Sequence, residues 1–380
     1  MLISAGLAPG KSIVHGIAPS EDILATLDCL ASLGANYIFE NGTVTIEGTN
    51  PFSVSPSELH CRESGSTLRF FIPICLLSGK KHTLYGSETL LSRPLSVYED
   101  ICKEQNLRFT KSSSSIELSG VLSPGSYRVK GNISSQFISG LLFALPLLDG
   151  DSTISIAPPI ESLSYINLTI QALSDFGVKV EWTDERTLFV KGNQSYIAHE
   201  VSVEGDYSNA AFFEALNMLD GNVSIGGLSP NSLQGDRVYS RFFEMLSRGT
   251  PTIHISDCPD LGPILFAVAA CKNGGVFTGT RRLKIKESDR AASMAEELQK
   301  FGVSVKMTDD SVVVYPAQFY APKDVLYGHN DHRIVMSLSV LLTLTGGEID
   351  GAEAVSKSMP DFFDKLKSIG IEVKEYADNQ

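Results

Sequence analysis

A chain of 380 residues is long enough to form two domains with large hydrophobic cores. Its formal net charge of −13 argues against a nucleic-acid partner, because nucleic acids attract basic surfaces. No apolar run approaches the length of a membrane span, the N-terminus lacks the charged start of a signal peptide, and the six cysteines show no CxxC spacing. We therefore expect a cytoplasmic protein without a membrane partner, a disulfide framework or a metal site.

Apolar helical stretches that end in glycine recur along the whole chain. These glycines are Gly10, Gly79, Gly150, Gly221, Gly274 and Gly346. They follow one another at intervals of about 70 residues, with one shorter interval in the second half. Glycine ends helices in the left-handed conformation, and short alternating strands follow these positions. The pattern predicts six small α/β modules, grouped three and three.

The two groups of modules meet near residue 203. After Trp182 and a strand at 187–191 the chain becomes polar over 192–199, and Val203-Glu204-Gly205-Asp206 then leads into a new helix. We expect an N-terminal domain at 1–203 and a C-terminal domain at 204–380, each with three modules.

Polar and charged motifs in the first half occupy the segments just before predicted helices. In chain order, Glu63–Arg69 precedes a helix at 70–77, Ser92-Arg93-Pro94 one at 95–104, Ser134-Ser135-Gln136 one at 137–148, and Ser162–Tyr165 one at 166–176. A helix start offers free N–H groups and a positive dipole end, so it suits a bound anion. Helix starts of parallel modules gather at one end, so we expect these motifs to line one cleft.

The second half repeats this arrangement with more charge. Pro259-Asp260 precedes a helix at 261–271, Lys286-Glu287-Ser288-Asp289-Arg290 one at 291–301, Asn330-Asp331-His332-Arg333 one at 334–344, and Lys357–Asp361 one at 362–369. Cations are disfavoured at helix starts, so Arg93, Arg290, Arg333 and Lys357 together favour a bound anion. Glu287 has no use in an anion clamp, which favours a role in proton transfer. Taken singly, a serine or aspartate here is usually an N-cap, and a cation is as often a solvated surface charge.

In this order and spacing, the motifs resemble those of the EPSP synthases, the 3-phosphoshikimate 1-carboxyvinyltransferases. The resemblance implies an α/β fold, a two-domain inside-out α/β prism in which each domain has three βαβαββ units. It implies transfer of the enolpyruvyl group of phosphoenolpyruvate to the 5-hydroxyl of shikimate 3-phosphate, with release of phosphate. It also implies that these two small molecules are the partners, that no metal or organic cofactor is needed, and that the protein is a monomer.

The resemblance also assigns site residues. Those expected at shikimate 3-phosphate are Ser134, Ser135, Gln136, Ser162, Tyr165, Asp260 and Lys286. Those expected at phosphoenolpyruvate are Gly65, Arg93, Gln136, Arg290, Arg333 and Lys357. The catalytic residues would be Asp260, Glu287 and Lys286, with Asp260 accepting the 5-hydroxyl proton and Glu287 moving a proton at the methylene carbon. Family members with a side chain at the position of Gly65 resist glyphosate.

Two departures from the family pattern leave alternatives open. Arg282 stands where many members carry a polar contact to shikimate 3-phosphate, and residues 1–10 resemble the helix that follows a Lys-Ser-x-Ser-x-Arg motif in the family. We therefore expect that this chain lacks that motif, which favours an inactive homologue as one alternative. A second alternative is UDP-N-acetylglucosamine enolpyruvyltransferase, but its catalytic cysteine has no counterpart in Leu90–Pro94, and Cys102 lies in the next predicted helix.

Overall fold

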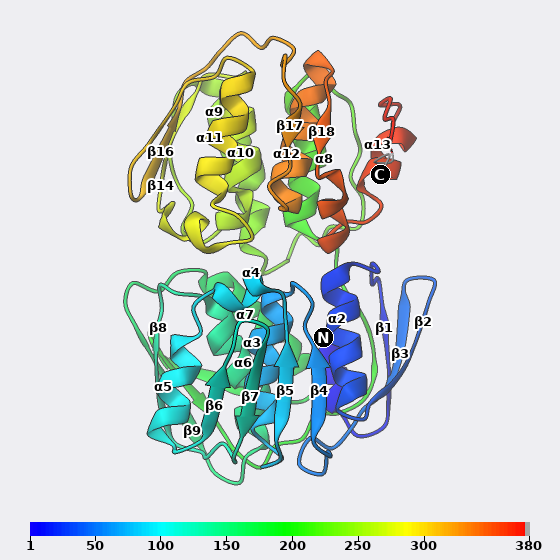
Figure 1. Ribbon diagram of the computed structural model, residues 1–380, viewed down its shortest axis with the longest axis vertical. Helices are drawn as coiled ribbons and strands as arrows, with labels where there is room; N and C mark the ends of the chain where they lie inside the picture. Colours follow the sequence, from blue (N-terminus) through cyan, green and yellow to red (C-terminus); the bar gives the residue numbers. More distant parts are fainter. Residues whose placement is uncertain (377–380) are drawn as a thin grey trace. The chain divides into compact units, whose positions relative to one another are not determined.

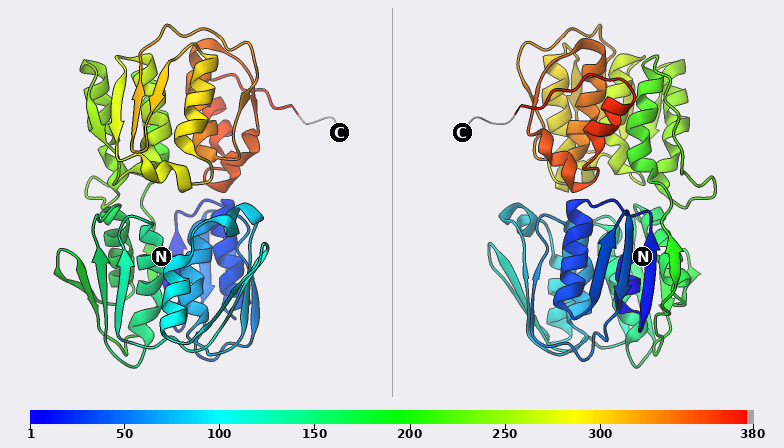
Figure 2. Two further views of the ribbon diagram at one scale, coloured as in Figure 1. Left: turned by 60° about the vertical axis from the view of Figure 1, so that its left-hand side comes forward. Right: turned by 90° about the vertical axis from the view of Figure 1, so that its right-hand side faces the viewer.

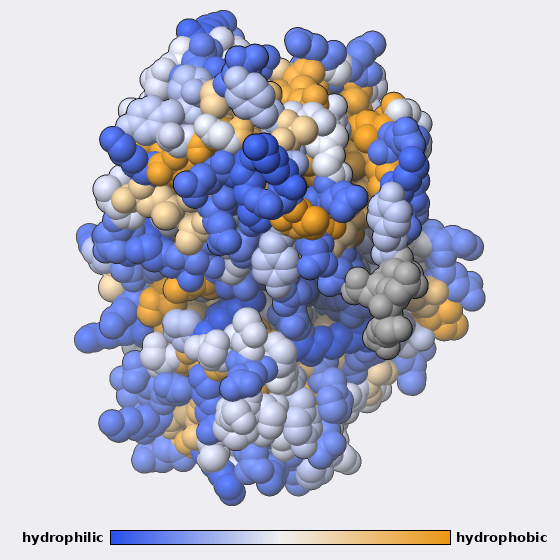
Figure 3. Space-filling view, turned by 45° about the horizontal axis from the view of Figure 1, so that its top comes forward, coloured by the Kyte–Doolittle hydropathy of each residue, from blue (hydrophilic) through white to orange (hydrophobic). Residues whose placement is uncertain are grey.

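The computed structural model describes residues 1–376, which divide into two compact units (Figure 1). Unit 1 comprises Met1–Glu204 and Leu233–Gly235, and unit 2 comprises Gly205–Ser232 and the chain from Asp236 onward. Each unit has its own hydrophobic core. Among residues 1–376, none of the helices combines the length and apolar character that crossing a bilayer requires. Hydrophilic residues cover most of the face shown in Figure 3, with hydrophobic residues in small groups between them.

Unit 1 contains three four-stranded sheets that share one strand plan. The first sheet has β12 (Glu200–Ser202), β1 (Lys11–His15), β3 (Thr43–Glu47) and β2 (Asn36–Glu40) in that order. The second has β4 (Ser57–His60), β5 (His82–Tyr85), β7 (Ser115–Ser119) and β6 (Arg108–Lys111), and the third has β8 (Ser126–Lys130), β9 (Ser152–Ala157), β11 (Thr187–Val190) and β10 (Val180–Asp184). In each sheet the first pair is parallel and the other pairs are antiparallel. Because β12 comes from the end of the unit, the returning chain completes the first sheet.

The helices of unit 1 provide the interior of its core (Figure 2). They are α1 (Leu2–Leu7), α2 (Glu21–Ser32), α3 (Gly65–Cys75), α4 (Glu88–Ser92), α5 (Ser96–Glu104), α6 (Ser135–Ala144) with the 3-10 turn η1 (Leu145–Leu147), and α7 (Leu163–Asp175). Almost every residue of α3 and α6 is buried, and α6 packs against both α3 and α7. Helices that are apolar on all sides belong inside a domain, whereas the strands alternate buried and more exposed residues. This arrangement is the inside-out fold that the family resemblance implies.

The described residues of unit 2 form one complete sheet of the same plan and one strand pair. The sheet runs β13 (Thr252–His254), β14 (Gly275–Thr278), β16 (Ser311–Val314) and β15 (Val305–Met307), and the pair is β17 (Leu326–Tyr327) with β18 (Ile349–Asp350). The helices are α8 (Tyr207–Met218), α9 (Tyr239–Arg248), α10 (Gly262–Cys271), α11 (Arg290–Lys300), α12 (His332–Thr345) and α13 (Phe362–Ser368). The 3-10 turns are η2 (Gly235–Val238), η3 (Pro259–Leu261), η4 (Arg281–Ile285) and η5 (Ala352–Lys357). Helix α10 is buried along almost its whole length and packs against α8, α9, α11 and α12.

The described part of unit 2 pairs fewer strands than three complete βαβαββ modules require. Only the module from β13 to β16 has all four strands, and residues 219–234 and 369–376 carry no assigned strand. Helix α9 ends at Arg248 and β13 begins at Thr252, which leaves too few residues between them for a β-hairpin. The short interval in the sequence repeat is the consequence of this missing hairpin.

Candidate active site

The first group of predicted site residues lies at the start of α3. We expected a helix at 70–77 with Gly65–Arg69 in the loop before it, but α3 begins at Gly65. The side chain of Ser64 caps the helix by accepting from the Thr67 backbone N–H at 3.3 Å. Arg69 therefore lies one helical turn after Gly65, with its side chain on the same face of the helix.

Two guanidinium groups and an amide surround Gly65. A Cβ atom added at Gly65 would lie 2.9 Å from Arg69 Nη1, 3.0 Å from Arg93 Nη1 and 3.8 Å from Gln136 Oε1. Arg93 follows the C-terminus of α4, and Arg69 Nη1 donates to Gln136 Oε1 at 2.7 Å. The structure thus brings Gly65, Arg93 and Gln136 together. Arg69 was missed as a site residue, although its position four residues after Gly65 in a helix start was a usable signal.

The remaining predicted residues of unit 1 lie at the starts of α6 and α7, which pack against each other. Ser134 caps α6 by accepting from the Gln136 backbone N–H at 3.3 Å, and Ser135 is buried in the first turn. Ser162 is fully buried, with a left-handed backbone at φ +58°, and its side chain does not cap α7. The Tyr165 N–H donates to the Ser162 carbonyl at 3.1 Å. A buried serine with a left-handed backbone suggests a constraint other than helix capping.

The second group of predicted residues forms a partly buried ion cluster around Asp260 in unit 2. Asp260 belongs to η3, just before α10, and its Oδ1 lies 3.0 Å from Lys286 Nζ and 2.6 Å from Arg290 Nη1. Its Oδ2 lies 3.2 Å from Nη2 of Arg333, in the first turn of α12. One carboxylate therefore joins the starts of three helices, α10, α11 and α12.

Arg290 connects this cluster to two further carboxylates. Its side chain is 1% exposed, and it donates to Glu287 Oε2 and, from Nε at 2.8 Å, to Asp331 Oδ2. Asp331 is fully buried and caps α12 by accepting from the Arg333 backbone N–H at 3.0 Å. Ser288 Oγ lies 3.1 Å from Asp331 Oδ2. Asp331 was also missed, because an aspartate directly before a helix has an ordinary explanation as an N-cap.

Two more buried residues border the cluster. Arg333 Nη1 donates to Ser208 Oγ in the first turn of α8 and, at 3.4 Å, to the Asp260 carbonyl. Burial raises the pKa of Asp236 to about 7, and the neighbouring Asp260 carboxylate acts in the same direction. Neither Ser208 nor Asp236 stands in a motif with a clear chemical signal, so sequence reasoning did not select them.

The ion pairs decide the protonation of the cluster. Burial alone would raise the pKa of Asp260, but Arg333, Lys286 and Arg290 outweigh it and hold the pKa well below its usual value. Burial lowers the pKa of Lys286, against the effect of Asp260, and Arg290 and Arg282 lower it further. Arg282, whose role the resemblance left open, is thus a buried neighbour of Lys286.

Lys357 lies beside the cluster rather than within it. Its Nζ donates to the Asn330 carbonyl at 2.7 Å, next to Asp331. The predicted residues of unit 2 therefore converge on the segment 330–333 and on the start of α11. A group of cations held by carboxylates at helix starts can bind an anionic ligand and exchange protons with it.

Comparison with known proteins assigns the chain to a family. The model of the family "EPSP synthase (3-phosphoshikimate 1-carboxyvinyltransferase)" matches residues 1–366. The chain belongs to the EPSP synthase family. A relative from Clostridium kluyveri, named 3-phosphoshikimate 1-carboxyvinyltransferase, is 38% identical over 99% of this chain and 93% of its own length. A relative of the same name from Clostridium acetobutylicum is 37% identical, with the same shares covered.

Solved structures show the same fold at low sequence identity. EPSP synthase from Acinetobacter baumannii superposes with a TM-score of 0.77 at 22% identity, over 98% of this chain and 93% of that one. The enolpyruvyl transferase NikO from Streptomyces tendae has a TM-score of 0.73 at 13% identity, over 98% of this chain and 92% of that one. The predicted two-domain α/β fold and the resemblance to the EPSP synthase family are both confirmed.

Proposed function

We propose that this protein transfers the enolpyruvyl group of phosphoenolpyruvate to the 5-hydroxyl of shikimate 3-phosphate, releasing phosphate. The relatives with the highest similarity reported above carry the name of this reaction. The protein would act as a cytoplasmic monomer, with these two small molecules as its ligands and without a metal or organic cofactor. The ion cluster around Asp260 is the observation that most supports this function.

Both substrates are polyanions, so the first task of the protein is to hold negative charge. We assign phosphoenolpyruvate to Gly65, Arg93, Gln136, Arg290, Arg333 and Lys357. The bare Cα of Gly65 beside two guanidinium groups leaves room for a ligand atom where a side chain would otherwise be. We assign shikimate 3-phosphate to Ser134, Ser135, Gln136, Ser162, Tyr165, Asp260 and Lys286. The hydroxyl and amide groups among them stand at the starts of two helices, where they suit a phosphate.

The reaction needs two proton transfers at different atoms. As the 5-hydroxyl oxygen bonds to the central carbon of phosphoenolpyruvate, Asp260 takes the hydroxyl proton and Glu287 gives a proton to the methylene carbon. A proton then leaves the resulting methyl group for Glu287 while the phosphate departs and takes up the proton that Asp260 held, and the enol double bond forms again. Lys286, paired with Asp260, contacts the same hydroxyl and balances the carboxylate charge.

Acceptor choice tests this function directly. The chain is mixed with phosphoenolpyruvate and either shikimate 3-phosphate or UDP-N-acetylglucosamine, and phosphate release is followed. Calorimetry with each substrate measures binding separately from turnover. Of the two acceptors, we expect only shikimate 3-phosphate to bind and to give phosphate release from phosphoenolpyruvate. Turnover with the nucleotide sugar, or binding without any turnover, would contradict the proposal and favour the sister enzyme or an inactive homologue.

A further inference from the structure

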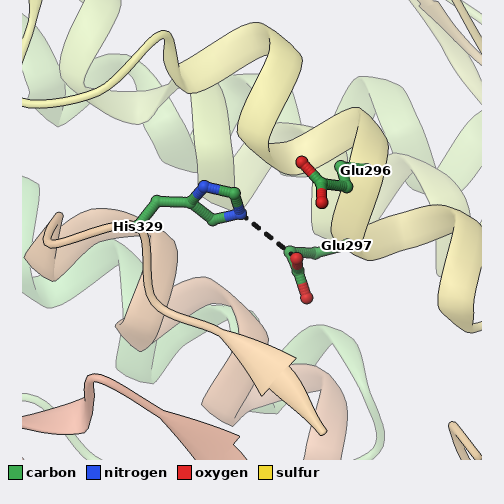
Figure 4. A group of neighbouring side chains, drawn as sticks. All are labelled: Glu296, Glu297 and His329. Atoms are coloured by element: carbon green, nitrogen blue, oxygen red, sulfur yellow. Dashed lines mark hydrogen bonds and ion pairs between the residues drawn. The ribbon is translucent and has the colours of Figure 1, made fainter. Parts of the chain in front are cut away.

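A buried carboxylate on α11 contacts the same segment as the ion cluster. Glu297 is fully buried and lies two helical turns after Arg290, on the same face of the helix. Its Oε2 accepts from the Tyr327 backbone N–H at 3.0 Å, and its Oε1 lies 3.1 Å from His329 Nε2 (Figure 4). Lys300 Nζ donates to both carboxylate oxygens, at 2.9 and 3.0 Å, and also to the Val325 carbonyl at 3.1 Å.

These bonds satisfy Glu297 as an ion pair rather than as a metal ligand. Ligand atoms of Glu296, Glu297 and His329 lie within 4.8 Å of one another, which is a spacing that a metal ion can use. The Lys300 ammonium, however, already provides the positive charge at both oxygens of Glu297. A buried carboxylate that accepts from a lysine, a histidine and a backbone amide has a structural explanation without a metal.

The segment that Glu297 holds is short and conformationally restricted. It runs from β17 through Gly328–Asp331 to the first residue of α12. His329 and Asn330 both have left-handed backbones, at φ +51° and +52°. Side chains make this conformation unfavourable, so two successive residues adopt it only where other contacts hold them there.

The same segment carries three contacts of the candidate active site. The Asn330 carbonyl accepts from Lys357, Asp331 pairs with Arg290, and Asp331 also caps the helix that presents Arg333. Helix α11 thus contacts the segment at two points. Arg290 pairs with Asp331 at one end, and Glu297 bonds to Tyr327 and His329 at the other. A shift of the segment would move every cation that we assign to phosphoenolpyruvate in unit 2.

We propose that Glu297 and His329 are positioning residues for phosphoenolpyruvate binding, because they hold residues 328–331 in the conformation that orients Arg290, Arg333 and Lys357. This inference rests on the proposed function. Neither residue touches the substrate in this proposal. Their effect passes through the backbone of the segment to the three cations.

Kinetics of matched variants test this role. Glu297→Gln keeps the shape of the side chain but removes the negative charge of the carboxylate that Lys300, Tyr327 and His329 all contact. His329→Asn keeps a residue that tolerates the left-handed backbone but loses the ring bond to Glu297. We expect both variants to raise the KM for phosphoenolpyruvate about tenfold or more, and to change the KM for shikimate 3-phosphate by less than about twofold. Glu296→Gln, an exposed neighbour on the same helix, is the control and should match the wild type.

A second measurement does not depend on turnover. Amide hydrogen exchange of residues 328–331 should be faster in Glu297→Gln and in His329→Asn, with the core of α10 unchanged. If both variants fold and their kinetics match Glu296→Gln, the positioning role is overturned, whereas a wild-type chain that fails to bind phosphoenolpyruvate overturns the proposed function instead. Equal increases in both KM values would also overturn the positioning role, because they would indicate general destabilisation.

Discussion

Arg290 and Asp331 form an ion pair that is almost completely removed from solvent. Their side chains are 1% and 0% exposed, and they are 41 residues apart in the sequence. The pair fastens the start of α11 to the start of α12. Because Arg290 also binds Asp260 and Glu287, the orientation of one guanidinium group fixes the arrangement of the cluster.

The first prediction concerns the stability that this pair contributes. Asp331→Ala leaves a buried guanidinium without one of its partners, and we expect the free energy of unfolding to fall by about 3–5 kcal/mol. Urea unfolding followed by circular dichroism measures the change. Arg248→Ala removes an exposed pair with Glu244 and should cost less than about 1 kcal/mol. Similar losses in the two variants would show that burial does not decide the strength of the Arg290–Asp331 pair.

The second prediction separates chemistry from binding. Asp260→Asn and Glu287→Gln keep the side-chain shape but remove a carboxyl group that takes or gives a proton in the proposed reaction, so we expect turnover to fall by about two to four orders of magnitude. Substrate dissociation constants, measured by calorimetry, should change much less. Asp309→Asn, which removes an exposed partner of Lys284, serves as the control and should keep full turnover. Wild-type turnover in either active-site variant would refute the assigned roles.

The third prediction concerns Gly65. A Cβ atom there would lie 2.9 Å from Arg69 Nη1 and 3.0 Å from Arg93 Nη1, so both guanidinium groups would have to shift. We expect Gly65→Ala to raise the KM for phosphoenolpyruvate and to weaken competitive inhibition by glyphosate, each by about tenfold or more. Gly226→Ala is the control, since an added Cβ at Gly226 meets no atom within 4 Å. Unchanged inhibition in the Gly65→Ala variant would contradict this prediction.

The fourth prediction concerns acid stability. Burial, assisted by Arg333, lowers the pKa of His332 from 6.5 to about 4. Between these values the unfolded chain binds a proton that the folded protein does not, so this histidine makes the folded state less stable as the pH falls from 6.5 toward 4. The loss should be about 1 kcal/mol per pH unit.

Urea unfolding at several pH values in this range measures that effect. His332→Gln cannot take up the proton, so its stability should fall less steeply with decreasing pH than that of the wild type. His60→Gln, a change at an exposed position, should leave the wild-type slope unchanged. Equal slopes for all three proteins would show that His332 does not titrate as the structure indicates.

The sequence repeat predicted the architecture better than it predicted the ends of individual helices. Glycine spacing indicated the modules, because helix ends need left-handed residues wherever the fold places them. The start of α3 was predicted too late, because Gly65-Ser66-Thr67 has low helix propensity. Capping by Ser64 and burial against α6 outweigh that propensity.

The cluster at the candidate active site was predictable only in part from the residues themselves. Glu287 and Arg290 stand three residues apart in one motif, so their local spacing indicates that they can meet. Asp260 lies 30 residues before Arg290, and only the packing of α10 against α11 brings them together. Its place in the site therefore came from the family resemblance. The left-handed backbone of Ser162 had no signal in the sequence.

The three cations of the cluster are each paired with carboxylates. Lys286, Arg290 and Arg333 are matched by Asp260, Glu287 and Asp331. An anionic ligand must therefore replace these carboxylates as the partner of the cations. A ligand with one weak negative group gains little binding free energy from this replacement. When an anion takes over Arg290 or Arg333, Asp260 loses the charges that suppress its basicity. In the proposed reaction, a multiply charged ligand at these cations would therefore raise the basicity of Asp260, the proposed proton acceptor.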